Sequence, residues 1–132
     1  MTAATAPTSI VTGVDFVSIP TKDFEKTRAF YADVLALAPS KLWGDKPMGA
    51  EFETGTVTIA LLNNAALGMD FSPNSGPIEF HVDDFAAAKA ELESRGVEFE
   101  GDTIDSGVCF QAFFKDPDGN ALAIHHRYAP AG

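Results

Sequence analysis

The sequence predicts an α+β fold built from two copies of one βαβββ module. An apolar run, an Asp-Phe pair and a helical pattern occur at residues 23–24 and again at residues 84–85, about 61 positions later. The ends of the copies also correspond, because residues 55–61 parallel residues 119–125 at an offset of 64. A module of this length cannot bury its apolar face alone, so the copies are expected to pack together or against another chain.

The first module, residues 13–63, begins with a strand over residues 14–20, where apolar residues alternate and Pro20 closes the run. Asp23 is the predicted N-cap of a helix, since apolar residues then recur at helical spacing to about Leu37. Pro39 is expected to stop this helix. Further short strands are predicted over residues 41–44, 49–53 and 56–62.

Residues 64–75 are rich in Asn, Gly, Pro and Ser and form the expected linker. The second module, residues 76–128, repeats the order, with a helix that Asp84 caps and Gly96 ends. Its predicted strands cover residues 77–82, 97–103, 107–115 and 121–127. The turn over residues 116–120 reads Asp-Pro-Asp-Gly-Asn, in which Pro fixes φ and Gly tolerates positive φ.

The composition indicates one globular domain, residues 1–132, with residues 1–12 as a flexible tail. A net charge of −10 argues against nucleic acid and anionic membranes as partners. No apolar run approaches the ~18 residues of a membrane span, and no secretory signal is recognisable. The single cysteine, Cys109, excludes an internal disulfide, and we expect it to be buried in a cytoplasmic protein.

The two modules, the Asp-Phe helix starts, the Phe30-Tyr31 pair and the Asp-Pro-Asp-Gly-Asn turn together resemble the vicinal oxygen chelate superfamily. That superfamily includes glyoxalase I, bleomycin- and fosfomycin-resistance proteins, extradiol dioxygenases and methylmalonyl-CoA epimerase. The resemblance covers residues 13–128. It implies a curled mixed sheet around a central cavity that holds the ligand. It also implies a homodimer, often with modules paired across chains.

Enzymes of this superfamily hold a divalent metal in the cavity, and the resemblance places its ligands at positions that are apolar here. Phe16 stands in the first strand where His is usual, and Pro77 is its counterpart in the second module. Ala123 stands where the last strand usually has Glu, and Ile59 is its counterpart by the offset of 64. None of these side chains carries a donor atom, so we expect neither the usual metal site nor a cofactor.

A displaced polar site is the alternative. Because residues i and i+2 share a strand face, Ser18, Glu79, His81 and His125 are expected to face one cavity. Glu79, His81 and His125 would form a competent set of ligands for a divalent metal, or they would line a polar pocket and hydrogen-bond one another. Both interpretations stay open. His126 is expected to face the opposite way from His125.

Trp43 is expected either to stack on a flat or cationic ligand or to pack in the core or a dimer interface. Four phenylalanines are expected mainly to pack around the cavity: Phe16, Phe52, Phe110 and Phe113. Four carboxylates are interpreted as capping or turn residues: Asp83, Asp84, Asp116 and Asp118. The predicted ligand-binding set is therefore Phe16, Ser18, Trp43, Glu79, His81, Ala123 and His125.

The resemblance thus favours a homodimeric protein of bleomycin-resistance type that binds a small organic molecule without the family metal. One alternative is a lyase, isomerase or dioxygenase of glyoxalase type that uses a displaced Glu/His site. The other is a non-catalytic subunit that acts through its dimer or partner surface. The identity of the ligand does not follow from the sequence.

Overall fold

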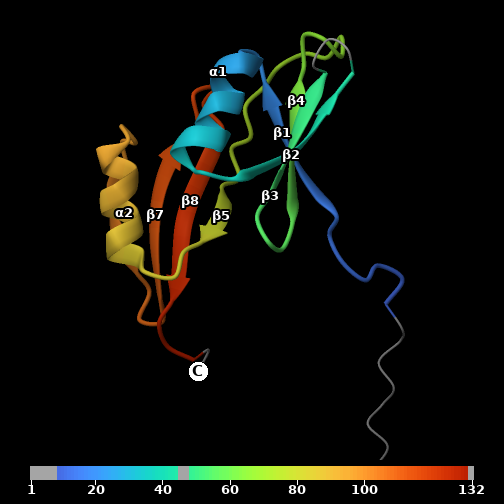
Figure 1. The fold of residues 1–132 in the computed structure, drawn as a ribbon. Coiled ribbons are helices and arrows are strands. Elements are labelled where there is room, and N and C mark those ends of the chain that lie inside the picture. The colour runs from blue at the N-terminus through green and yellow to red at the C-terminus, as the bar shows by residue number, and fades with distance from the viewer. Residues whose placement is uncertain (1–8, 45–47, 131–132) are drawn as a thin grey trace, which may run out of the picture.

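The structure, a computed structural model, describes residues 9–44 and 48–130 and contains the two βαβββ modules (Figure 1). Residues 1–8 of the expected tail lie outside the described residues. The first module comprises β1 (Phe16–Thr21), α1 (Phe24–Ala29), a π-helical segment η1 (Phe30–Val34), β2 (Ala38–Trp43), β3 (Gly49–Glu53) and β4 (Thr58–Asn63). The second comprises β5 (Ile78–His81), α2 (Phe85–Ser94), β6 (Glu100–Asp105), β7 (Cys109–Lys115) and β8 (Ala121–Arg127).

Each module forms its own four-stranded mixed sheet, and the two sheets have equivalent strand orders. The orders are β1-β4-β3-β2 and β5-β8-β7-β6. In each sheet the first strand runs parallel to the last, while the other neighbours are antiparallel. The predicted α+β class is therefore confirmed, although the two sheets do not close into a barrel. None of the helices in the described ranges is long and apolar enough to cross a membrane.

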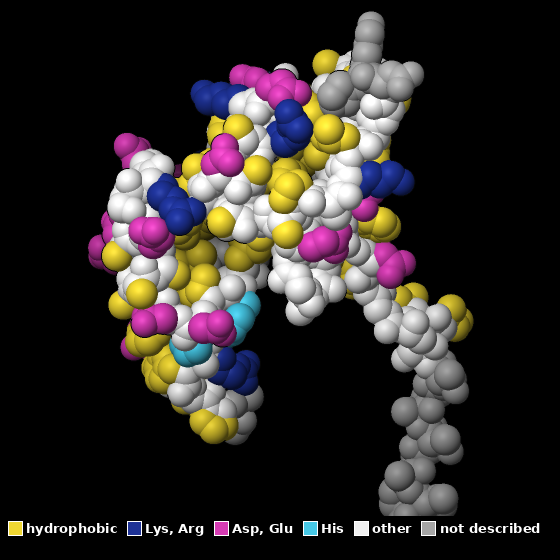
Figure 2. All heavy atoms as spheres, in the orientation of Figure 1, with side chains coloured by type: hydrophobic (Ala, Val, Ile, Leu, Met, Phe, Trp, Pro, Cys, Tyr) yellow, Lys and Arg dark blue, Asp and Glu magenta, His cyan; other side chains and the backbone are white. Residues whose placement is uncertain are grey.

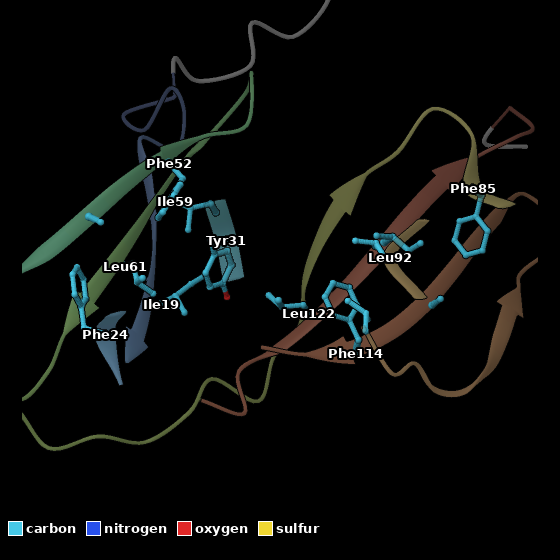
Figure 3. Packing of buried hydrophobic residues seen from close by; sticks show 14 residues of the cluster. Ile19, Phe24, Tyr31, Phe52, Ile59, Leu61, Phe85, Leu92, Phe114 and Leu122 are labelled. Atoms are coloured by element: carbon cyan, nitrogen blue, oxygen red, sulfur yellow. The ribbon is translucent and has the colours of Figure 1, made fainter. Parts of the chain in front are cut away.

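Within residues 9–44 and 48–130, a helix covers one face of each sheet and no helix covers the other face. In β1, buried Ile19 and half-buried Val17 alternate with exposed Phe16 and Ser18. The helix α1 contacts β4, and α2 contacts β8. Figure 3 shows the resulting core, in which Ile19, Phe52 and Leu61 gather on the first sheet and Phe114, Leu92 and Leu122 on the second. We call the uncovered side of each sheet its helix-free face.

The first helix is shorter than its apolar pattern predicted. Regular helix ends at Ala29, η1 adds one wider turn to Val34, and Ala36 then adopts φ 57°. Pro39 does not stop the helix, because it lies inside β2. An edge strand such as β2 tolerates proline, since one of its sides has no ladder hydrogen bonds to lose.

Helix-end signals were confirmed in the second module and only partly in the first. Asp84 caps α2, because its Oδ1 accepts from Ala87 N (3.1 Å). Gly96 follows the helix at φ 94°, as a C′ glycine does. Asp23 occupies the N-cap position of α1, but its side chain makes no capping hydrogen bond. The predicted strand at residues 97–103 begins only at Glu100.

Strand pairing corrects the predicted correspondence between the modules. Ser18 pairs with Ala60 in the first sheet, and Glu79 pairs with Ala123 in the second. The counterpart of Ala123 is therefore Ala60 and not Ile59, which is buried on the helix-covered face. The offset of 64 relates Gly55 to Gly119 but not the strands that follow them. The strand β4 begins at Thr58, three residues after Gly55, whereas β8 begins at Ala121, two residues after Gly119.

Candidate ligand-binding site

Buried polar side chains join the two modules. Tyr31 of η1 donates to Asp116 Oδ2 (2.6 Å), and Thr27 of α1 donates to Asp118 Oδ2 (2.6 Å). Thr21, at the end of β1, also donates to Asp118. None of these five side chains is more than 6% exposed. Asp116 and Asp118, predicted only as turn residues, therefore also make the contact between modules, which we call the inter-module joint.

The Asp116 carboxylate organises this joint. Its Oδ1 accepts from the backbone N–H groups of Asp118 (2.9 Å) and Asn120 (3.0 Å), which fixes the turn. Burial, followed by the adjacent Asp116 charge, raises the pKa of Tyr31 far above its ordinary range. Tyr31 therefore stays protonated at neutral pH and remains a hydrogen-bond donor.

The linker between modules is tied into the same joint. Asn120 Nδ2 donates to Pro20 O (2.9 Å), and Asn120 Oδ1 accepts from Asn74 N (2.8 Å). Asn74 Nδ2 in turn donates to Ser18 O (3.1 Å). Because β1, the linker and the turn between β7 and β8 are held by one set of contacts, the joint fixes how the two sheets sit relative to each other.

A cavity of about 620 Å³ lies between the two modules, and we call it the inter-module pocket. Figure 2 shows a hollow between the modules lined mostly by hydrophobic side chains. The walls come from the helix-covered faces of both sheets and from α2, and include Val17, Ile59, Ile78, Phe80, Leu92 and Ile124. A concave, mainly apolar cavity of this size is typical of small-molecule sites.

The segment that follows η1 forms another wall of this pocket and is held by an arginine of the second module. Arg95, the residue after α2, donates from Nη1 to Asp33 O (3.2 Å) and Val34 O (3.1 Å). These are carbonyls at the end of η1, where helical backbone has no partner of its own. Arg95 Nη2 also donates to Glu91 Oε1 (3.2 Å). Arg95 therefore bridges α2 to η1 along one side of the pocket.

Of the seven residues predicted to bind the ligand, only Glu79 and His81 line the inter-module pocket. The other five do not line it: Phe16, Ser18, Trp43, Ala123 and His125. Strand alternation accounts for the five that do not, because the pocket lies against the helix-covered faces, where β5 presents Ile78 and Phe80. Glu79 and His81 alternate with these two residues and still line the pocket, because all four belong to the short strand β5. The five residues that do not line the pocket lie on the helix-free faces, where the exposed fraction of Phe16 is 53%. Their role in ligand binding stays a prediction.

Glu79, His81 and His125 share the second helix-free face but do not form a ligand set. Glu79 accepts from Gln111 Nε2, and His81 Nε2 lies 2.9 Å from Asp83 Oδ1. No three His, Cys, Asp or Glu side chains in the described ranges are grouped closely enough to hold a metal ion. At the positions where the resemblance places the metal ligands, the side chains of Phe16 and Ala123 have no atom that could coordinate a metal ion. The residues present therefore do not fit that metal.

Trp43 and His126 are each held by a local contact. Trp43 Nε1 donates to Glu51 Oε2 (2.5 Å), and its ring covers Gly49, where an added Cβ would lie 2.5 Å from Trp43 Cε3. His126 Nδ1 donates to Val82 O (2.9 Å). These contacts account for the orientation of both rings without a ligand.

Sequence reasoning missed Arg95 and the contact made by Tyr31. A tyrosine inside an apolar helical stripe was a usable signal, because a buried hydroxyl needs a partner. The sequence signal for Arg95 was weaker: a basic residue at the C-terminal end of a helix often donates hydrogen bonds to backbone carbonyls that have no helical partner. Its sequence position suggested that its side chain would bond the carbonyls of its own helix, whereas the side chain bonds those of η1.

Solved structures with this fold include both a binding protein and an enzyme. TnmS3, an antibiotic binding protein from a Streptomyces species, is 24% identical with a TM-score of 0.74, over 90% of this chain and 98% of that one. A putative glyoxalase family protein from Bacillus anthracis is 22% identical with a TM-score of 0.77, over 90% and 98%. A lactoylglutathione lyase from Agrobacterium tumefaciens is 17% identical with a TM-score of 0.72, over 87% and 93%. At these identities the likeness establishes the fold alone.

No curated protein sequence matches the chain. A sequence profile matches residues 13–124, which include both modules. The inference that the sequence motifs supported is therefore confirmed, and the chain belongs to the Glyoxalase/Bleomycin resistance protein/Dioxygenase superfamily.

Proposed function

We propose that this protein binds a small organic molecule in the inter-module pocket, by non-covalent contacts and without the family metal. The observation that carries the proposal is the pocket itself, because about 620 Å³ between the modules is walled by apolar side chains from both sheets and from α2. The fold shared with TnmS3, an antibiotic binding protein, supports the proposal by analogy.

The metal-free part of the proposal rests on the donor positions. Phe16, Pro77, Ala123 and Ala60 stand where the superfamily's enzymes would hold the ion, and none has a side-chain donor. We expect elemental analysis of the purified protein to find no stoichiometric Zn, Ni, Mn or Fe. About one tightly held metal per chain, lost on His125→Ala, would contradict this and favour a glyoxalase-type enzyme.

The binding test uses Nile red, a neutral dye whose fluorescence rises in apolar surroundings. We expect saturable binding to the native protein. Ala88 lines the pocket on α2, so Ala88→Trp should occupy part of the cavity and weaken dye binding. Ala90 is exposed on the same helix and does not line the pocket, so Ala90→Trp is the matched control. Equal dye binding by the two variants, with native circular dichroism, would refute the pocket as the site.

A cytoplasmic homodimer is the proposed form of the protein. Phe16 (53% exposed) lies on a sheet face that no helix covers, so a second copy would bury apolar surface there. The free, buried thiol of Cys109 fits a reducing compartment. Light scattering is expected to give twice the chain mass of 14.0 kDa, and the single-chain mass at micromolar concentration would contradict the dimer.

A further inference from the structure

We infer that the inter-module pocket takes an uncharged molecule with an apolar body, and that it discriminates against both anions and cations. This inference rests on the proposed function, because it assigns the ligand class of the same pocket. The inference follows from the arrangement of the pocket, whose walls are apolar. Its polar side chains stand at the rim, and each already has a hydrogen-bond partner.

The polar groups of the rim are the side chains of two threonines, two glutamates, one histidine and one arginine. They are Thr54, Thr56, Glu79, His81, Glu91 and Arg95. The two hydroxyls are used within the turn between β3 and β4, where Thr54 Oγ1 donates to Val57 O (2.7 Å) and lies 3.2 Å from Thr56 Oγ1. Both hydroxyl protons are therefore used within the turn, and neither is free to donate to a ligand.

The charged groups of the rim are satisfied in the same way. Arg95 uses its guanidinium on Asp33 O, Val34 O and Glu91. Glu91 also accepts from Ser94 Oγ (3.0 Å), and these contacts hold the pKa of its carboxyl below the ordinary range, so it remains an anion committed to them. Glu79 accepts from Gln111 and His81 contacts Asp83, as described above.

The rim charges also reach into water and away from the apolar walls. The side chain of His81 is 67% exposed and that of Glu91 is 60% exposed. By contrast, the walls include Ile59 and Ile124, which are 1% and 2% exposed. A charged ligand group that entered the pocket would lose its hydration without gaining an unpaired partner, and burying an unpaired charge is costly.

The charge of the whole chain makes the exclusion stronger for anions than for cations. A net charge of −10 repels anionic molecules before they reach the pocket. Cations are attracted to the surface, but Glu91 is already paired with Arg95, and Glu79 already accepts a hydrogen bond from Gln111. An uncharged molecule avoids both penalties, and its apolar body can displace water from walls that contact it by dispersion alone.

The experiment compares three compounds with the same body, namely phenylhexanol, phenylhexylamine and phenylhexanoate, as competitors for bound Nile red. We expect the alcohol to displace the dye at a concentration at least about tenfold lower than either ion requires. An amine or a carboxylate that competes as well as the alcohol would overturn the inference. Failure of Nile red to bind at all would instead overturn the proposed function.

Two charge-neutralising variants test the role of the rim directly. Glu79→Gln and Glu91→Gln preserve shape, and we expect each to leave the affinity for phenylhexylamine unchanged within about twofold. A tenfold loss in either variant would reveal a carboxylate that is free to hold a cation, and would overturn the inference. Glu93→Gln is the matched control, because Glu93 is exposed on α2 and does not line the pocket.

Discussion

The hydroxyl of Tyr31 donates to Asp116 Oδ2 over 2.6 Å, although 85 positions separate the two residues in the sequence. Tyr31 is 0% and Asp116 5% exposed, so this bond is shielded from water. The same Oδ2 accepts from Asn120 Nδ2 (2.8 Å). One carboxylate therefore ties η1 of the first module to the turn of the second.

Tyr31→Phe should lower the free energy of unfolding by about 1–3 kcal/mol, because it removes a donor from a buried carboxylate. Urea unfolding followed by circular dichroism measures the loss. Tyr128→Phe is the matched control, since Tyr128 also donates to a carboxylate, Asp105 (2.6 Å), but at an exposed site. That change should cost less than about 0.5 kcal/mol. Equal losses in the two variants would contradict a stabilising inter-module joint.

The raised pKa of Tyr31 predicts a loss of stability at alkaline pH. Its ordinary value is 10.0, and burial beside Asp116 raises the pKa far above that in the folded protein. The folded protein therefore holds this proton more tightly than the unfolded chain does. The resulting stabilisation is complete below pH 10.0 and is lost as the pH rises above it. We expect the free energy of unfolding to fall above that pH, and to fall less steeply in Tyr31→Phe.

Tyrosine absorbance provides the independent check. The chain has two tyrosines, and the exposed one, Tyr128, is expected to ionise while the protein is folded. Tyr31 should ionise only together with unfolding. Ionisation of both tyrosines in a protein that keeps its native circular dichroism would show that the Tyr31 hydroxyl is not buried in the inter-module joint.

The sequence correctly predicted the features that depend only on residues close together in the chain. Asp84, Gly96 and the turn at residues 116–120 behave as expected because capping and positive φ depend on neighbouring residues. The η1 segment was missed, since its apolar residues keep ordinary helical spacing while the backbone changes. Strand alternation correctly grouped Glu79 with His125, but it cannot say which face of a sheet a helix covers. The prediction therefore included Glu79 and His81, which line the pocket, but not Ile78 and Phe80, which β5 contributes from its helix-covered face.

Gly49→Ala should destabilise the first sheet by about 1–3 kcal/mol through overpacking. An added Cβ would lie 2.5 Å from Trp43 Cε3 and 2.8 Å from Leu61 O, and the backbone atom cannot move aside cheaply. Because Trp43 is the only tryptophan, its fluorescence should report the displacement of the ring. Gly76→Ala is the control, since an added Cβ there meets nothing within 4 Å. Native fluorescence and unfolding in Gly49→Ala would show that the ring is not packed on this glycine.

Arg95→Ala should accelerate ligand exchange more than it changes stability. The Arg95 side chain is 38% exposed, so its ion pair with Glu91 is expected to contribute less than about 1 kcal/mol. Its bonds to Asp33 O and Val34 O, however, hold the wall that follows η1 against α2. Without them the wall should open more often, and Nile red should dissociate severalfold faster with a nearly unchanged unfolding midpoint.

Hydrogen exchange tests the same bridge without any ligand. Leu35 N donates to Phe30 O (3.1 Å) and Leu37 N donates to Tyr31 O (3.0 Å), so both amides are protected while η1 and its following turn stay closed. Arg95→Ala should speed exchange at these two amides. The control is Arg28→Ala, because the contacts of Arg28 stay within α1: a pair with Glu25 (2.7 Å) and a position over the Phe24 ring (5.9 Å to the centroid). If both variants left exchange at Leu35 and Leu37 unchanged, η1 would be held by its own packing, and the role of Arg95 as a bridge would be wrong.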